Sequence, residues 1–300
     1  MLGSLRDAGL IAWFHLRRAL RTRSAVVLAL ANALIAGGGA WFFTRVLLEL
    51  ERAAARTLRV PETKRPGAML DTLREQDQLS DILRPLVGSD ELLEWALQLP
   101  VLTPIHFWLA LGVMPFLAVA LGAETVAPDV RDRSLRYELV RTGRLELLLG
   151  RFAGQALLLG LATVVAAGGT WLISATVMVQ QPLLAQAASL LGLTPRLWLW
   201  ALPFLGLGVA ASQLTGNVNV ARALGLGAAL ASWIGFGILQ SPWGEEHPVL
   251  VDLVEPLLPQ GWMMDLWGPG LGWWSSGLVL GALGVVFALL AWPVFGRRNL

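Results

Sequence analysis

The residue types that usually carry chemistry are scarce in this chain. It has no cysteine, so disulfides, thiolate metal sites and cysteine nucleophiles are excluded. Its three histidines, His15, His106 and His247, lie far apart in the sequence, so a histidine metal cluster is not expected. The single lysine, Lys64, lies outside any G-x-x-x-x-G-K-[ST] pattern, and no H-E-x-x-H or G-x-S-x-G motif occurs. We therefore expect no ATP site, no enzymatic activity, no metal and no cofactor in this chain itself.

The composition points to the membrane rather than to a soluble enzyme. The 300 residues are 55% hydrophobic and only 15% charged, and the mean hydropathy is +0.61. Soluble domains carry about 25% charged residues. The formal net charge of +2 is too small to indicate a nucleic-acid partner. These values predict a protein that crosses the bilayer several times.

Six stretches contain no Asp, Glu, Lys or Arg and are long enough, or nearly so, to cross a bilayer. A helix needs about 20 residues to cross roughly 30 Å of hydrocarbon. The runs are continuously apolar rather than alternating, so a closed barrel is not indicated. The predicted fold is therefore all-α, with six transmembrane helices over 24–44, 101–123, 152–179, 197–214, 223–240 and 272–295.

The arginines predict the orientation. If both termini are cytoplasmic, the inner segments hold 14 of the 23 basic residues but only 6 of the 21 acidic ones, as the positive-inside rule requires. The mixture of arginines with Leu5, Trp13 and Phe14 before the first span predicts an amphipathic interfacial helix over 1–23. The alternative for this segment is an ordinary basic flank that only fixes the topology.

Two outer segments are expected to have structure of their own. The insert 45–100 should begin as a continuation of the first helix, break at Pro61 to Pro66, and continue as amphipathic stretches that carry Leu70 and Leu73. The loop 241–271 has five prolines and apolar runs too short to span, so we expect a re-entrant pair of short helices in the outer leaflet.

The inner segment 124–151 is the best candidate for a functional site. It holds eleven charges beside two spans, and Pro128, Ser134 and Gly143 should delimit a short helix. A membrane protein without an ATP site needs a place where a cytoplasmic partner can act, and a compact charged helix would provide it. The alternative is a solvated loop that obeys the positive-inside rule.

Together these features resemble the permease subunits of type-2 ABC transporters, a class of exporters with six spans per subunit. The resemblance covers nearly the whole chain. Arg133, Thr142 and Arg151 stand where the family pattern has glycine, proline and lysine. The matching positions are Glu124, Ser134-Leu135, Arg144, Leu148-Leu149-Gly150-Arg151, Ser212 with Ala221, and the ending F-G-R-R-N-L over 295–300.

The resemblance implies a function and a set of partners. The loop after the second span would be a coupling helix that docks on a separate ATP-binding subunit, which would hold the ATP and Mg²⁺. A second copy of the permease would complete the transporter in a bacterial plasma (inner) membrane, and the 45–100 insert could meet an extracytoplasmic partner protein. The contact residues would be Arg133, Arg136, Tyr137, Glu138, Arg141 and Arg144.

Other interpretations remain open at this stage. An ATP-independent secondary transporter would need ionisable groups near the bilayer centre, and the spans offer only His106. A structural membrane anchor fits the composition but leaves the charged segment unexplained. The substrate is not predicted, since Asn32 and His106 are better explained by contacts to neighbouring groups. The Gly150/Gly154 and Gly277/Gly281 spacings are better explained by packing within the chain than by a dimer.

Overall fold

The fold is a bundle of long helices. The computed structural model describes residues 2–21, 23–58, 66–67, 90–140, 142–178, 182–268 and 270–297, and no strand occurs among them. The predicted all-α class is therefore confirmed for this part of the chain. The helices are α1 (Leu2–Leu20), α2 (Arg23–Leu58), α5 (Asp90–Gln98), α6 (Leu102–Ala123), α7 (Ala127–Arg131), α8 (Leu135–Leu139), α9 (Arg144–Val177), α10 (Leu183–Leu214), α11 (Val218–Leu239), α12 (Pro242–Glu246), α13 (Pro248–Val254), α14 (Trp273–Leu289) and α15 (Trp292–Arg297), with short 3₁₀ turns at Glu255–Leu257, Pro259–Trp262 and Met264–Leu266.

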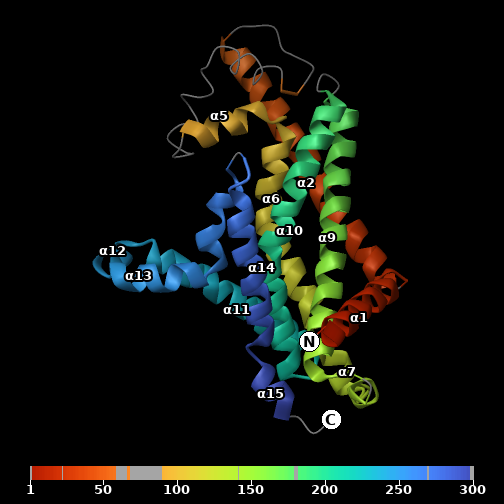
Figure 1. The fold of residues 1–300 in the computed structure, drawn as a ribbon. Coiled ribbons are helices and arrows are strands. Elements are labelled where there is room, and N and C mark those ends of the chain that lie inside the picture. Colours follow the sequence, from red (N-terminus) through yellow and green to blue (C-terminus); the bar gives the residue numbers. More distant parts are fainter. Residues whose placement is uncertain are drawn as a thin grey trace.

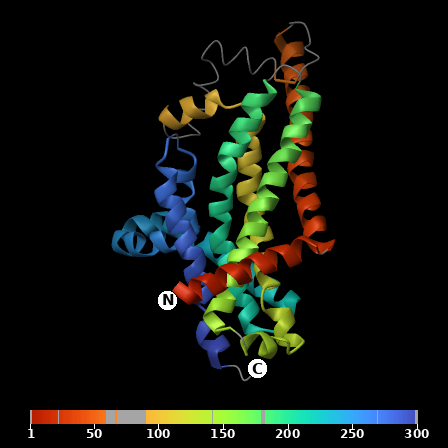
Figure 2. The same cartoon turned by 45° about the vertical axis from the view of Figure 1, so that its right-hand side comes forward.

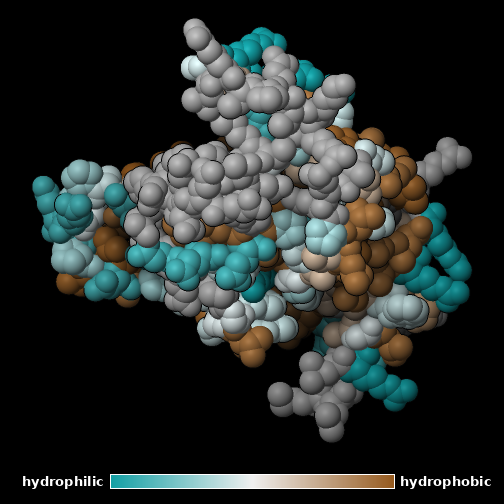
Figure 3. Space-filling view, turned by 90° about the horizontal axis from the view of Figure 1, so that it is seen from above, coloured by the Kyte–Doolittle hydropathy of each residue, from teal (hydrophilic) through white to brown (hydrophobic). Residues whose placement is uncertain are grey.

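Six of these helices are long and apolar enough to cross a membrane: α2, α6, α9, α10, α11 and α14 together with α15. This finding indicates a multi-pass membrane protein. Seen from the end that carries α5, hydrophobic residues form a broad patch on one flank of the bundle (Figure 3). Apolar side chains on an outer flank are what a lipid environment would accommodate.

The helices are longer than the charge-free windows. α9 begins at Arg144 rather than near residue 152, and α10 begins at Leu183 rather than near 197. The reason is that Arg151 and Arg196, which border the charge-free windows, bind groups supplied by other parts of the fold, so they do not end the helix. α2 continues to Leu58, as the sequence predicted for the start of the 45–100 insert. Leu70 and Leu73, in the second part of the insert, lie outside the described residues.

α10 is the centre of the bundle and the most buried of the six helices. It packs against α6, α9, α11 and α14 (Figure 1). Glycines permit the closest of these approaches: a Cβ on Gly208 of α10 would lie 2.5 Å from the backbone oxygen of Val119 on α6. Trp200 is fully buried here, and its indole donates to the Leu111 carbonyl at 3.1 Å. This packing fixes the lower ends of α6 and α9, which carry the site described below.

The two ends of the bundle differ. α1, α7 and α15 lie at one end, and α1 runs across the foot of α9 (Figures 1 and 2). α5 lies at the opposite end, above α14 (Figure 1). We call the first end the charged end, because it carries the charged segment between α6 and α9. The predicted interfacial helix is thus a separate helix, and its place in the headgroup layer stays a prediction.

The loop 241–271 forms a pair of short helices, α12 and α13, followed by the 3₁₀ turns. The pair projects sideways from the bundle beyond the end of α11 (Figure 1). Val249 and Leu253 are strongly exposed on it, and α13 has no buried residue. The predicted helical pair is present, and its insertion into the outer leaflet stays a prediction.

Candidate functional site

The charged segment between α6 and α9 folds into two short helices, α7 and α8. Pro128 lies in the first turn of α7, where its missing N–H leaves no backbone bond unmade. α7 is followed by a turn at Arg133, which has a φ of +55°. This left-handed conformation is costly for a residue with a Cβ and natural for glycine, which the resembled family pattern has at this position. The strained turn sets the direction of α8.

α8 has an inner face that is fixed to the bundle. Leu135 is buried in the same hydrophobic core as Leu147 and Leu148 at the base of α9. Thr142 donates its hydroxyl to the carbonyl oxygen of Glu138 at 3.0 Å and so closes the end of the helix. Gly143 then separates α8 from α9, as the sequence predicted. The helix therefore does not hang free in a loop.

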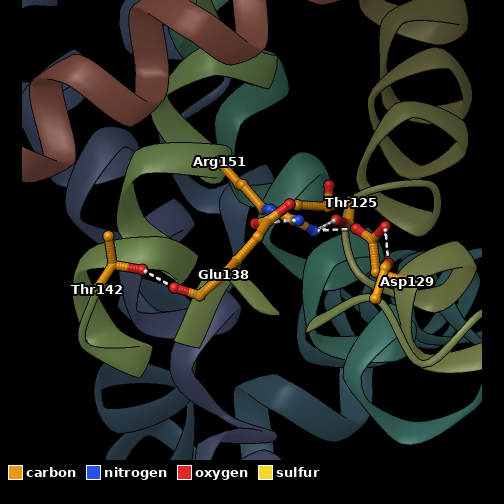
Figure 4. Close-up of polar contacts among 6 residues, drawn as sticks. Thr125, Asp129, Glu138, Thr142 and Arg151 are labelled. Atoms are coloured by element: carbon orange, nitrogen blue, oxygen red, sulfur yellow. Dashed lines mark hydrogen bonds and ion pairs between the residues drawn. The ribbon is translucent and has the colours of Figure 1, made fainter. Parts of the chain in front are cut away.

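Arg151, two turns into α9, is the central residue of the site. Its side chain is only 6% exposed, and its guanidinium donates to the Thr125 carbonyl at 2.7 Å, to a carboxylate oxygen of Asp129, and to Oε2 of Glu138 at 2.7 Å (Figure 4). Ser134 donates to the other oxygen of Asp129 at 2.8 Å. We call these five residues the Arg151 network. It joins α9 to the end of α6, to α7 and to α8.

A buried ion pair of this kind is costly to break from one side. Taking Arg151 away would leave the carboxylates of Asp129 and Glu138 without a counter-charge, and such an uncompensated loss costs about 3–5 kcal/mol when the pair is fully buried. The carboxylates are partly exposed, so water would compensate some of this loss. The network therefore holds α7 and α8 to α9 as one unit.

Two further contacts link this end of the molecule. Arg144, the first residue of α9, donates to the carbonyl oxygens of Phe295 at 2.9 Å and Gly296 at 2.5 Å, near the end of α15. A cation at the carboxyl end of a helix also compensates the helix dipole. Glu124 at the end of α6 forms an ion pair with Arg222 near the start of α11. Both residues of this pair are about two-fifths exposed, so it contributes no more than about 1 kcal/mol.

The outer face of α8 is exposed. Tyr137 is 68% exposed, and the guanidinium of Arg136 lies over its ring and donates to its hydroxyl at 3.2 Å. Val140 is even more exposed, at 84%. Aromatic and arginine side chains beside apolar ones are the groups enriched at the centres of protein interfaces. We call Arg136, Tyr137 and Val140 the α8 outer face.

The structure thus sorts the six residues that the sequence singled out as contacts. Arg133, Arg136 and Tyr137 are exposed. Glu138 and Arg144 are engaged with other parts of this chain. Arg141 lies outside the described residues.

Sequence reasoning missed Asp129 and Arg151 as a pair and did not include Val140. Arg151 was noticed only as a substitution in the resembled motif. The available signal was that an arginine inside an otherwise apolar helix needs a carboxylate nearby, and Asp129 and Glu138 are the acids of the preceding segment.

The small-residue spacing Gly150-x-x-x-Gly154 holds α1 against α9. A Cβ on Gly150 would lie 2.8 Å from the carbonyl oxygen of Ala8, and one on Gly154 would lie 3.0 Å from that of Ala12. The predicted packing within the chain is confirmed for this pair. In the second pair, a Cβ on Gly277 would lie 2.6 Å from Leu199 Cδ1 of α10, whereas one on Gly281 would be 4.0 Å from Leu202 Cδ1. Only Gly277 of that pair therefore makes a close helix contact within this copy.

Asn32 and His106, the two polar residues singled out inside the spans, each contact a neighbouring group, although Nε2 of His106 is buried without a partner. Asn32 donates to the Ala162 carbonyl at 2.9 Å, as the sequence analysis favoured. His106 has its Nδ1 2.8 Å from the Thr170 hydroxyl. Both line a cavity of about 10 Å³, which is room for one water molecule and not for a substrate. Among the described residues no group of three or more His, Asp and Glu side chains is placed to hold a metal ion.

Comparisons with known proteins do not identify this chain. No protein-family model matches it. No curated protein matches it either. The functional conclusion therefore depends on the geometry of the charged end and on the resemblance of the motifs.

Proposed function

We propose that this chain is the permease subunit of an ABC-type transporter and is driven by a separate ATP-binding subunit that docks on the α8 outer face. The observation that carries this proposal is the two-sidedness of α8. Its inner face is fixed to α9 through Leu135 and the Arg151 network, while Arg136, Tyr137 and Val140 stay exposed. A helix built in this way is suited to receive a push and pass it to a membrane-spanning helix.

The charges support the orientation that this function requires. The same end of the bundle holds α1 with its arginines, the charged segment and α15 with Arg297. An excess of arginine marks the cytoplasmic side of a membrane protein, where an ATP-binding subunit would be found. The proposal therefore places the charged end in the cytoplasm of a bacterial cell and α5 outside it.

The mechanism follows from the contacts. Two copies of this chain and two ATP-binding subunits would form the transporter, and ATP and Mg²⁺ would be bound by the ATP-binding subunits. Closure of those subunits would displace α8. Because Arg151 ties α8 to α9, the displacement would move α9 against α10 and change the balance between inward-open and outward-open states.

The docking prediction is tested by co-expressing this chain with an ATP-binding protein encoded beside it. The double variant Arg136→Glu with Tyr137→Ala should reduce co-purification of that protein at least tenfold, because about 1.4 kcal/mol of lost contact energy is a factor of ten in affinity. Vanadate-sensitive ATP hydrolysis in liposomes should depend on the unaltered chain and fall to the same extent.

The matched control is Arg52→Glu, which makes the same charge change near the far end of α2. It should leave co-purification and hydrolysis within twofold of the unaltered chain. Unchanged co-purification of the double variant would move the docking site away from α8. Hydrolysis that is indifferent to the presence of this chain would contradict the proposed function as a whole.

A further inference from the structure

A cavity of about 300 Å³ lies at the charged end, between α1, α8 and the base of α9. Ile11 and Phe14 of α1 and Leu147 of α9 form an apolar wall. Phe14 is 62% exposed although it is a large aromatic side chain. The cavity is a built feature of the fold, because the Gly150–Gly154 contact fixes α1 at this height on α9.

The polar part of the cavity lining contains unused hydrogen-bond donors. Arg18 lines the cavity, and its guanidinium pairs with no side chain in the part of the chain that the structure describes. Nε2 of His15 is buried there without a partner. The second guanidinium, that of Arg151, is already bound to Asp129 and Glu138.

The charge of the lining indicates the ligand. Arg151 is neutralised by Asp129 and Glu138, whereas Arg18 has no carboxylate partner among the described residues, so a ligand with one negative charge would pair with Arg18. A phosphodiester has that charge and accepts hydrogen bonds from arginine in a well-defined geometry. Nε2 of His15 is shielded from the cavity, so Arg18 is the donor that a ligand there would reach.

The apolar wall indicates a lipid rather than a soluble phosphate. We propose that the cavity binds one anionic phospholipid, with its phosphate against Arg18 and an acyl chain along Ile11, Phe14 and Leu147. Leu10, Trp13 and Leu20 are also exposed on α1, as expected for a helix in contact with acyl chains. The bound lipid would connect α1 to α8, so its presence would stabilise the Arg151 network. This site does not depend on the docking of an ATP-binding subunit.

The test uses the purified, delipidated chain and native mass spectrometry, with phosphatidylglycerol and phosphatidylcholine of identical acyl chains as probes. Phosphatidylglycerol should bind at least tenfold more tightly than phosphatidylcholine. Arg18→Gln should weaken phosphatidylglycerol binding about tenfold, the loss expected for one charge-assisted hydrogen bond. Arg17→Gln, which removes the same charge from an exposed neighbour that does not line the cavity, should change binding less than twofold.

Three results would overturn the proposal. Equal losses for Arg18→Gln and Arg17→Gln would mean that the arginines of α1 attract lipid only through their general charge. Equal binding of the two lipids would exclude a site for one negative charge. Displacement of phosphatidylglycerol by inorganic phosphate at equal concentration would mean that the acyl chain contributes nothing. Because Arg18 is exposed, its substitution is not expected to prevent folding.

Discussion

Two arginines are buried in the part of the chain that the structure describes, one at each end of the bundle, and the protein accommodates them in different ways. Arg151 at the charged end is neutralised by two carboxylates. Arg196 on α10 donates to the carbonyl oxygens of Leu266 and Gly268, both at 2.9 Å, and lies between the rings of Trp95 and Trp273. Among the described residues it has no acidic partner.

The difference teaches how each end is held. Carbonyl groups and tryptophan rings do not titrate, so the Arg196 contacts tie α5, α10 and α14 together under all conditions. Cation–π contacts contribute about 0.5–2 kcal/mol each, depending on how well they exclude water. The Arg151 network consists of charges that a partner or a proton can compete for. The contacts at the α5 end are therefore permanent, whereas those at the charged end can be changed by a partner or by protonation.

The largest effect on the free energy of unfolding should come from substituting each of the two buried arginines in turn. Arg151→Met should lower the free energy of unfolding by about 3 kcal/mol, because it leaves two carboxylates without a counter-charge. Arg196→Met should lower it by about 2 kcal/mol, because it strands two carbonyl groups but no charge. Denaturation in detergent measures both values.

The two variants should also differ in how readily trypsin cleaves the charged end. Arg151→Met should expose the bonds of α7 and α8 to trypsin, whereas Arg196→Met should leave them protected. If both variants lose the same stability and both open the charged end, the two arginines have the same role and the comparison fails. Arg131→Met is the control: it changes an exposed arginine whose one ion pair among the described residues is with its neighbour Asp132, and it should leave the free energy of unfolding unchanged.

A smaller effect should come from pH at the charged end. Burial, followed by the nearby charges of Arg151 and Arg18, lowers the pKa of His15 to about 4, although Asp129 and Glu138 act in the opposite direction. The folded state therefore binds this proton less well than the unfolded state, so stability is complete above pH 6.5 and falls as the pH drops towards 4. A shift from 6.5 to about 4 corresponds to roughly 3 kcal/mol, and screening by water at the partly exposed imidazole should reduce the observed loss to roughly 1–2 kcal/mol.

His15→Gln should remove that part of the pH dependence in thermal denaturation experiments between pH 7.5 and 4. His247→Gln, at an exposed site on the other side of the molecule, should leave the pH dependence unchanged. If the unaltered chain, His15→Gln and His247→Gln all have the same pH profile, the contact of α1 with α9 does not shield His15 from protonation.

The smallest effect should come from the turn before α8. Arg133→Gly should raise the free energy of unfolding by about 0.5–1 kcal/mol, because glycine adopts a positive φ without strain. Arg133→Ala keeps a Cβ and should not stabilise the chain, which makes it the matched control in the same denaturation measurement. Equal effects of the two substitutions would mean that the strain at this turn is not significant.

The sequence was sufficient for the architecture but not for the contacts at the site. The six spans follow from runs without charge, because an unpaired charge in an apolar environment is too costly to tolerate. The same reasoning ended the predicted spans at Arg151 and Arg196, although both residues lie inside helices. What makes them acceptable are partners supplied by other elements: Asp129 and Glu138 for one, Leu266 and Gly268 for the other. The pattern of one helix does not reveal which segments fold against it.

Three other segments of the chain bind to the first three turns of α9. Arg144 holds α15, Gly150 and Gly154 seat α1, and Arg151 binds α7 and α8. α1 and α15 are thus both attached to α9, and a rotation of α9 caused by a displacement of α8 would move them as well. Since α9 has 34 residues, that rotation would be transmitted over about 50 Å, from the charged end to the opposite end of the bundle.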